Sequence, residues 1–368
     1  MIEVKEVAET KTSPKTIDGS VFSHPSFSNH EQVVFCYDEK TGLKSIIAVH
    51  STVLGPALGG TRMWKYASEA DALNDVLRLS RGMTYKAAIS GLNLGGGKAV
   101  IIGDAKKDKS EALFRKYGQF VNRLGGAYIT AEDVGTNVND MEFVSKETKS
   151  VSGLQGKSGD PSPVTAYGVY MGMKASAKHK WGNDSLSGKT IGVQGVGHVG
   201  EYLVELLAKE NAKIIISDIN EEQLKHVATK YGAEVVSLDG IYDVNMDIYA
   251  PCALGASVNT DTLNRLKCSI IAGSANNQLA DETIHGMMVM KKGIIYAPDF
   301  LINAGGLINV YSELEGYNRE AAMEATRKIY DVTLEILKKS DAEKIPTINS
   351  AKQIAEKRIA DKLKSQTV

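Results

Sequence analysis

The sequence predicts an α/β protein built from two domains, and three features support this class. First, 368 residues are more than one ordinary hydrophobic core accommodates. Second, from about residue 190 onward, short runs of branched aliphatic residues alternate with helical stretches, which indicates a parallel sheet with crossover helices. Third, the Gly-, Pro- and Ser-rich segment GLQGKSGDPSP is a candidate hinge. We therefore expect domains over 1–150 and 151–344, with a C-terminal helix over about 345–368 that could complete the first domain.

The first domain is expected to combine strands and amphipathic helices, after a loosely structured arm that ends near residue 30. From Ser68 to about Ile89, apolar residues recur at three- and four-residue steps, which predicts a helix. A second helix starts at Ser110, and Gly125-Gly126 ends it. Between the two helices, GLNLGGG is interpreted as a glycine turn that leads into a strand. The strands are expected at VVFCYDE, LKSIIAVHST, KAVIIG and AYITAED.

The second domain is expected to begin with a helix over about 165–178 and then to alternate between strands and helices. A charged helical segment over about 318–365 follows the last strand. The strands are expected in TIGVQG, AKIIISD, AEVVS, MDIYAPCA, SIIAGSA and GIIYAP.

Composition excludes several classes of partner. The formal net charge is -1, so nothing in the bulk charge favours nucleic acid or an anionic membrane. No stretch approaches the length of a membrane span, and the polar N-terminus lacks the apolar core of a signal peptide. The three cysteines are sparse and odd in number, which fits a reducing compartment. The seven histidines show no metal-ligand spacing. We expect a cytoplasmic protein without a metal.

A glycine fingerprint predicts a dinucleotide site in the second domain. Gly195, Gly197 and Gly200 form G-x-G-x-x-G between an apolar strand and a helix, and the intervening Val196, His198 and Val199 share the same turn. The first glycine permits a tight turn, the second lets the backbone approach a pyrophosphate, and the third packs helix against strand. The alternative is a glycine-rich turn in an unrelated α/β sheet.

An acid in the next strand indicates which dinucleotide is bound. Asp218 ends AKIIISD, eighteen residues after Gly200, where a carboxylate can accept hydrogen bonds from ribose hydroxyls and repel a 2′-phosphate. Ile219 and Asn220 follow, so no cation is present to bind that phosphate. The pattern predicts a Rossmann domain that binds NAD rather than NADP.

Two lysines of the first domain stand in apolar surroundings. Lys86 lies near the end of the predicted helix and Lys98 at the start of the following strand, with twelve residues and a glycine turn between them. The chain can therefore bring both amines into one cleft, where desolvation and a second cation lower a lysine pKa. One amine could then act as a base while the other binds an anion. The alternative is a pair of solvated surface lysines.

An acid at a strand end could complete this group. Asp133 follows the strand AYITA, at a position from which catalytic groups often project. It could equally cap the helix that begins near NDMEFVS, because Asp is a preferred cap residue. Glu132 competes with it as the functional acid, and order in the sequence does not separate the two.

Six motifs together resemble the Glu/Leu/Phe/Val dehydrogenases, most closely the leucine-specific branch of that family. They occur in family order as GPALGGTRMW, RGMTYKAAISGLNLGGGKAVIIGD, GGAYITAEDVGTNVNDM, GVQGVGHVG, IAGSANNQL and YAPDFLINAGGLINV. The resemblance implies a substrate domain first, a Rossmann NAD domain second and an active site in the cleft between them. It implies reversible oxidative deamination of an apolar, branched-chain L-amino acid to a 2-oxo acid and ammonia. It also implies a homo-oligomer, commonly an octamer.

The resemblance assigns roles residue by residue. Lys86 matches the lysine that binds the substrate α-carboxylate, and Gly59 and Gly60 line the same part of the pocket. Lys98 matches the catalytic lysine that acts through a water, and Asp133 matches the acid that handles protons at the amino group. The remaining assignments are Asn277 beside the nicotinamide and the amino group, and Thr165 beside the cofactor.

The predicted side-chain pocket is apolar. By resemblance it is lined by Leu58, Ala131, Leu307 and Val310, and glutamate-specific members carry a lysine and a serine in place of Leu58 and Val310. A γ-carboxylate buried against these two side chains would be left unpaired, so glutamate is disfavoured. One methylene contributes only about 1–3 kcal/mol of discrimination, so branched-chain substrates should overlap. Phenylalanine, valine or another amino-acid specificity, or a non-catalytic NAD-binding regulator, are the alternatives.

Overall fold

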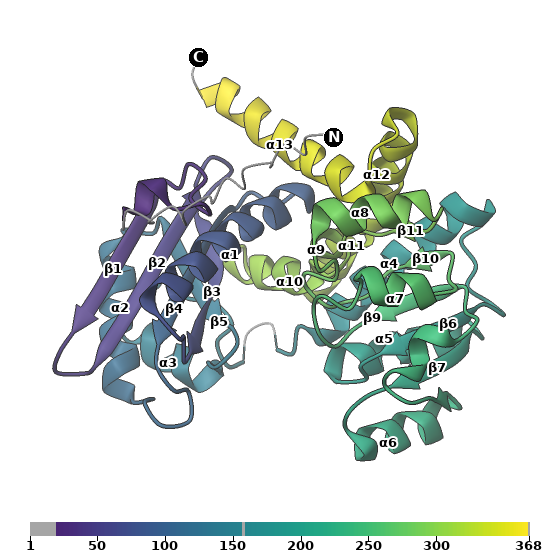
Figure 1. The fold of residues 1–368 in the computed structure, drawn as a ribbon. Coiled ribbons are helices and arrows are strands. Elements are labelled where there is room, and N and C mark those ends of the chain that lie inside the picture. The colour runs from purple at the N-terminus through teal and green to yellow at the C-terminus, as the bar shows by residue number, and fades with distance from the viewer. Residues whose placement is uncertain (1–19, 157–158, 367–368) are drawn as a thin grey trace, which may run out of the picture.

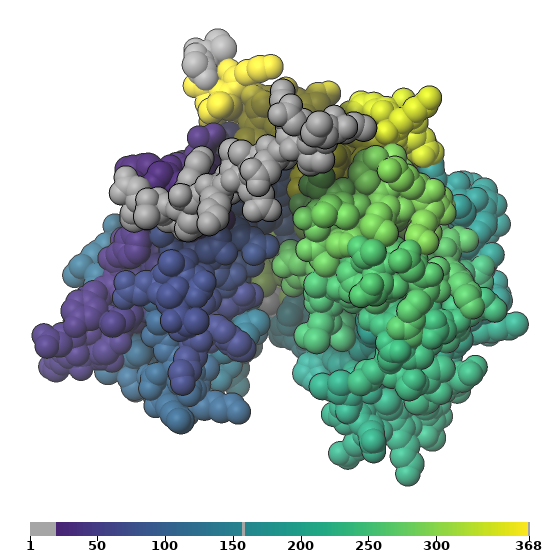
Figure 2. All heavy atoms as spheres, viewed as in Figure 1, coloured from purple at the N-terminus to yellow at the C-terminus, as the bar shows by residue number. Residues whose placement is uncertain are grey.

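The computed structural model describes residues 20–156 and 159–366, which form two lobes that each surround one β-sheet (Figure 1). The predicted two-sheet α/β class is confirmed. Most of the N-terminal arm, and residues 157–158 of the candidate hinge, lie outside the described residues. In the space-filling view a cleft separates the lobes at the bottom of the picture (Figure 2).

The first lobe is a five-stranded sheet covered by helices on both faces. Its strands run in the order β1-β2-β4-β3-β5, with β1–β2 and β2–β4 antiparallel and the pairs of β3 parallel. Helix α1 packs on one face and α2 and α3 pack on the other, since two separate apolar clusters lie on the two faces. The elements are β1 (Gln32–Asp38), β2 (Leu43–Ser51), β3 (Ala57–Trp64), α1 (Glu69–Ile89), β4 (Gly95–Ile102), α2 (Glu111–Arg123), β5 (Tyr128–Glu132) and α3 (Val138–Ser145).

The interpretation of GLNLGGG as a turn that reaches residue 97 is wrong. The three glycines are the first residues of β4, and the sequence also failed to predict β3, which contains Gly59 and Gly60. Close packing explains why glycines occupy these strands. A Cβ on Gly59 would lie 1.7 Å from the Gly97 carbonyl oxygen, and a Cβ on Gly96 would lie 2.0 Å from the backbone nitrogen of Thr84 on α1. The missing side chains let strand approach strand, and helix approach sheet.

The second lobe is an entirely parallel six-stranded sheet in the order β11-β10-β9-β6-β7-β8. The order reverses at β6, and in such sheets ligands bind beyond the carboxyl ends of the strands at the reversal. All the predicted strand regions contain a strand, although β8, β10 and β11 have only two residues each. The elements are α4 (Ser162–Trp181), β6 (Thr190–Gln194), α5 (His198–Lys209), β7 (Lys213–Ser217), α6 (Glu221–Tyr231), β8 (Glu234–Val235), β9 (Ile248–Pro251), α7 (Thr260–Arg265), β10 (Ile270–Ile271), α8 (Glu282–Lys291) and β11 (Ile295–Tyr296).

The C-terminal helices connect the lobes. After α9 (Asp299–Ile302), α10 (Gly305–Leu314), α11 (Arg319–Arg327) and α12 (Ile329–Glu343), helix α13 (Thr347–Gln366) crosses to α1 (Figure 1). The Arg358 guanidinium donates to the carbonyl oxygens of Ala88, at 2.9 Å, and Gly91, at 3.0 Å, where α1 ends. The contact agrees with a C-terminal helix that returns to the first domain, but the domain limits of 150 and 344 stay predictions.

Candidate active site

Lys98 and Asp133 meet at the edge of the first sheet. Lys98 is buried in β4, Asp133 directly follows β5, and the Lys98 Nζ lies 3.1 Å from Asp133 Oδ1. The strand between them, β3, contributes Gly60, and a Cβ there would lie 2.9 Å from the Asp133 Cβ. It also contributes Arg62, whose Nε donates to Asp133 Oδ2 at 3.0 Å. The carboxylate is therefore held between two cations.

The geometry distinguishes Asp133 from the two alternatives that the sequence left open. Helix α3 is capped by Asn137, whose side chain accepts from the Asp140 backbone nitrogen, so Asp133 does not cap it. The Glu132 side chain is exposed, whereas Asp133 forms both ion pairs. Asp133, not Glu132, is thus the carboxylate that lies next to Lys98.

Burial and pairing act in opposite directions on these charges. Burial lowers the pKa of Lys98, Asp133 raises it, and Arg62 lowers it again, with a net shift downward. Burial raises the pKa of Asp133, but Lys98 and Arg62 together outweigh it and hold that pKa below its usual value. Lys98 therefore loses its proton more easily than an ordinary lysine, beside a carboxylate that stays ionised.

Lys86 extends from the last turn of α1 toward the second lobe. Its Nζ lies 3.5 Å from Asn276 Oδ1, which also accepts from Asn303 Nδ2 at 2.9 Å. Burial lowers the pKa of Lys86 to about 8, with Asp299 raising it and Lys98 lowering it. Lys86 thus senses the charge of Lys98, as expected for two amines in one cleft.

The sequence predicted a role for Asn277, but the asparagine that contacts Lys86 is its neighbour Asn276. Asn277 has an exposed side chain and a left-handed backbone (φ 52°), and its role stays a prediction. Asn276 is the residue that the structure brings to Lys86.

Apolar side chains from both lobes lie in one cluster. Leu58 of β3 is buried in it with Leu307 of α10, and Val310 of α10 packs against it partly buried. Ala131 of β5 is buried opposite Gly60. The positions predicted to line the side-chain pocket therefore carry no charge and no hydrogen-bonding side chain.

The glycine fingerprint has the shape that a dinucleotide requires. Gly195 has a φ of 97°, and its Cβ would lie 2.8 Å from the Ala253 nitrogen. A Cβ on Gly200 would lie 2.1 Å from the Gly195 carbonyl oxygen, so helix and strand are in close contact there. By contrast, a Cβ on Gly197, the residue before α5, would meet nothing within 4 Å. The turn is closed on its protein side and open at the helix N-terminus, which fits a pyrophosphate.

Among the other predicted cofactor residues, Asp218, His198 and Val199 lie at this turn, whereas Thr165 lies on a different element. Asp218 Oδ2 accepts from the Val196 nitrogen at 2.7 Å, which ties the end of β7 to the fingerprint and leaves further lone pairs for a ribose. His198 begins α5 and is exposed, while Val199 is partly buried. Thr165 lies in the first turn of α4, where its hydroxyl donates to the Pro161 carbonyl oxygen.

Sequence reasoning missed Arg62, Asp75, Tyr66 and Asn276. The signal for Arg62 was present, because a charged residue inside the apolar strand β3 needs a buried partner. Asp75 gave no comparable signal, since acidic residues are common on the exposed faces of helices.

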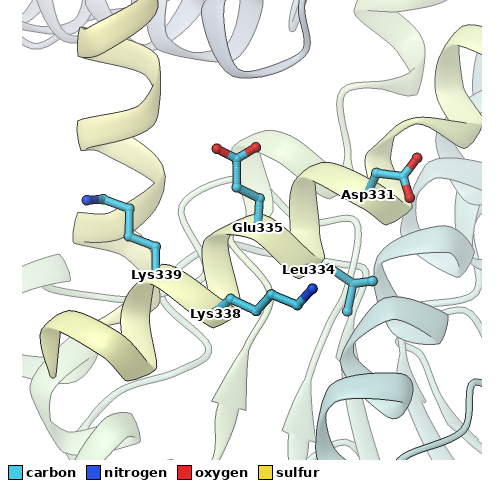
Figure 3. A pocket seen from close by; sticks show the side chains of 5 residues that line it. All are labelled: Asp331, Leu334, Glu335, Lys338 and Lys339. Atoms are coloured by element: carbon cyan, nitrogen blue, oxygen red, sulfur yellow. The ribbon is translucent and has the colours of Figure 1, made fainter.

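Three further observations concern the rest of the described residues. Within residues 20–156 and 159–366, no three His, Cys, Asp or Glu side chains are arranged to hold a metal ion. None of the helices in these ranges is both long and apolar enough to span a membrane. A surface pocket on α12 is lined by Asp331, Leu334, Glu335, Lys338 and Lys339, apart from the residues described above (Figure 3).

The chain matches two family models. Residues 30–150 match "Glu/Leu/Phe/Val dehydrogenase, dimerisation domain", and residues 156–222 and 216–367 match "Glutamate/Leucine/Phenylalanine/Valine dehydrogenase". The family resemblance of the sequence motifs is thereby confirmed.

Individual proteins are similar over nearly the whole chain. The leucine dehydrogenase of Thermoactinomyces intermedius is 56% identical over 92% of this chain and 93% of its own. The leucine dehydrogenase of Bacillus cereus is 54% identical over the same shares. Among solved structures, the L-tryptophan dehydrogenase of Nostoc punctiforme is 44% identical, with a TM-score of 0.83 over 91% of this chain and 97% of that one.

Proposed function

Because this chain belongs to the Glu/Leu/Phe/Val dehydrogenase family, we propose that it catalyses reversible NAD-dependent oxidative deamination of leucine and other branched-chain L-amino acids. The chain is an amino-acid dehydrogenase of the leucine dehydrogenase type, and the family uses a nicotinamide cofactor. The interpretation as a non-catalytic regulator is therefore abandoned. The observation that carries the proposal is the Lys98–Asp133 ion pair, which lies near Lys86 beside an apolar cluster shared by both lobes.

Each charged residue has one task in the proposed reaction. The charged amine of Lys86 binds the α-carboxylate, in a space that Gly59 and Gly60 keep free of side chains. The nicotinamide, when bound, accepts the α-hydride. Lys98 takes a proton from the water that attacks the resulting imino acid, and Asp133 moves protons at the amino nitrogen as ammonia leaves. Amino acid, NAD⁺ and water give 2-oxo acid, ammonia, NADH and a proton.

The apolar cluster supports a branched-chain substrate. Leu58, Leu307 and Val310 offer no partner to a γ-carboxylate, so glutamate would lose several kcal/mol of hydration without compensation. A leucine side chain buried there would contribute about 25 cal/mol per Å² of apolar area. Valine, phenylalanine and tryptophan specificities stay alternatives, because one tryptophan dehydrogenase is similar over nearly the whole chain.

Asp218 supports NAD over NADP. Its carboxylate lies beside the fingerprint, and the next residue, Ile219, is exposed and uncharged. A 2′-phosphate would therefore face an anion with no adjacent cation. We expect kcat/KM with NAD⁺ to exceed that with NADP⁺ by at least about 100-fold.

The assembly and location are also proposed. The N-terminal family model is described as a dimerisation domain, and the edge strand β1 exposes Phe35 and Tyr37. Exposed aromatic side chains on an unpaired edge strand favour self-association. We propose a cytoplasmic homo-octamer, tested by light scattering for a mass of eight 39.6-kDa chains.

A panel of amino acids tests the function directly. Purified full-length protein is assayed with NAD⁺ and each of leucine, isoleucine, valine, phenylalanine, tryptophan and glutamate, with NADH formation as the readout. We expect the three branched-chain substrates to lead and glutamate to be poorest. A preference for an aromatic amino acid would overturn the substrate proposal, and the absence of turnover with every amino acid would overturn the function.

A further inference from the structure

A chain of alternating charges extends from the Lys98–Asp133 pair through Arg62 to Asp75 on α1. Asp133 Oδ1 lies 3.1 Å from Lys98 Nζ, and Asp133 Oδ2 accepts from Arg62 Nε at 3.0 Å. Arg62 Nη1 then donates to Asp75 Oδ2 at 2.9 Å, and the same oxygen accepts from the Tyr66 hydroxyl at 2.7 Å. The order that starts at Lys98 is cation, anion, cation, anion and phenol.

These residues come from separate elements that tertiary packing brings together. Lys98 is on β4, Arg62 is on β3, Asp133 follows β5, and Asp75 is on α1. The side chains of Arg62, Asp75 and Asp133 are each about a quarter exposed, at 24%, 25% and 24%. Water therefore screens their charges only in part, and each charge acts on its neighbours more strongly than on an open surface.

We propose that Arg62 and Asp75 are positioning residues of the deamination reaction: Asp75 orients Arg62, and Arg62 orients the Asp133 carboxylate and balances the charge around Lys98. The inference rests on the proposed function, because it concerns the same site. In this proposal neither Arg62 nor Asp75 touches the substrate or the cofactor.

The shape of the guanidinium explains why an arginine is needed here. Its planar group presents donors in fixed directions, and two of them, Nε and Nη1, each donate to a different carboxylate. With Asp75 in place, Arg62 has no freedom to rotate away from Asp133. Without Asp75, the Arg62 guanidinium could rotate, and Asp133 Oδ2 would lose the Nε donor that holds it in place.

The charge of Asp75 has a second effect, which reaches Lys98. The charged groups that act on Lys98 are Asp133 and Asp75, which raise its pKa, and Arg62, which lowers it. Removing the charge of Asp75 leaves Arg62 less compensated, so the pKa of Lys98 falls further. A weaker base that is deprotonated at lower pH is the expected result.

The test is the Asp75→Asn variant, with Asp71→Asn as its matched control. Both changes remove one negative charge from α1, but Asp71 contacts Ser68 at the helix start and has no contact with Arg62. The pH profile of kcat/KM for leucine is measured in the full-length enzyme. For Asp75→Asn we expect kcat to fall about 10-fold and the acidic limb to move down by roughly half a pH unit, with KM for leucine nearly unchanged. Asp71→Asn should match the wild type.

Two further variants separate orientation from charge. Arg62→Lys keeps the positive charge but loses the planar fork, so kcat should fall with little movement of the pH profile. Tyr66→Phe removes only the hydrogen bond to Asp75 and should lower kcat by about two-fold. It also keeps the proposal testable if Asp75→Asn does not fold.

The outcomes distinguish this inference from the proposed function. An Asp75→Asn profile that superimposes on those of Asp71→Asn and the wild type overturns the positioning role, as does a loss of thermal stability with unchanged kinetics. A wild-type enzyme that deaminates no amino acid overturns the proposed function instead.

Discussion

The two lobes build their parts of the site in different ways. The first lobe uses charged side chains that hold one another, with Asp133 between Lys98 and Arg62. The second lobe uses backbone and the absence of side chains, with Gly195 and Gly200 in contact and Gly197 open. The charged group of the first lobe therefore depends on the protonation state of its side chains, and the glycine fingerprint of the second depends on the space left by missing side chains. Variants of the Lys98–Asp133–Arg62 group should change pH profiles, and variants of the glycine fingerprint should change cofactor binding alone.

The largest expected effect comes from removing the base. Lys98→Ala should lower kcat by at least about 100-fold, because the other cation paired with Asp133 in the described part of the chain is Arg62, whose guanidinium stays protonated and cannot act as the base. Binding of NAD⁺, measured by calorimetry, should stay within about two-fold of the wild type. Turnover close to that of the wild type would remove Lys98 from the proposed mechanism.

The second prediction tests the volume-dependent half. Gly200→Val places atoms where even a Cβ would lie 2.1 Å from the Gly195 carbonyl oxygen, so the fingerprint must shift. We expect KM for NAD⁺ to rise by about 30-fold, while the pKa values of the kcat profile keep their positions.

Gly82 on α1 provides the control for this change. A Cβ there meets nothing within 4 Å, so Gly82→Ala should leave KM for NAD⁺ unchanged. A pH profile altered by Gly200→Val would contradict the separation between the two lobes.

The third prediction concerns the pH dependence of carboxylate binding. The pKa of Lys86 is lowered to about 8, so its amine is charged below that pH and neutral above it. Binding of 4-methylpentanoate, which is leucine without its amino group, should weaken above about pH 8, approaching 10-fold per pH unit. Titration calorimetry across this range measures the effect.

Lys86→Arg sharpens that result. An arginine stays charged over the whole range, so the dependence above pH 8 should disappear. Equal pH dependence in both proteins would assign the titration to a group other than Lys86.

The smallest expected effect tests the connection between the lobes. Arg358 on α13 donates to the carbonyl oxygens of Ala88 and Gly91 at the end of α1, the helix whose last turn carries Lys86. Arg358→Lys should raise KM for leucine by about three-fold and lower the free energy of unfolding by about 1 kcal/mol. Thermal denaturation and steady-state kinetics measure the two effects, and an unchanged KM would show that α13 does not position Lys86.

Much of the site was predictable from local sequence. The fingerprint ending at Gly200, the acid at Asp218 and the lysines in apolar surroundings each follow from neighbours along the chain. Strand β3 was not predictable in this way, because Gly59 and Gly60 interrupt the alternation of buried and exposed side chains by which strands are detected. The triple glycine of β4 was mistaken for a turn for the same reason.

The sequence by itself determined the family and most of the order of helices and strands, with β3 missed, and it singled out Lys86 and Lys98 by their apolar surroundings. Tertiary structure alone decided that Asp133 rather than Glu132 faces Lys98, and that Arg62 and Asp75 join them. Arg62 and Asp133 are 71 positions apart, and the register of β3 against β5 sets their distance. Such register depends on how whole elements pack, because a shift of one residue turns every side chain of a strand to the opposite face.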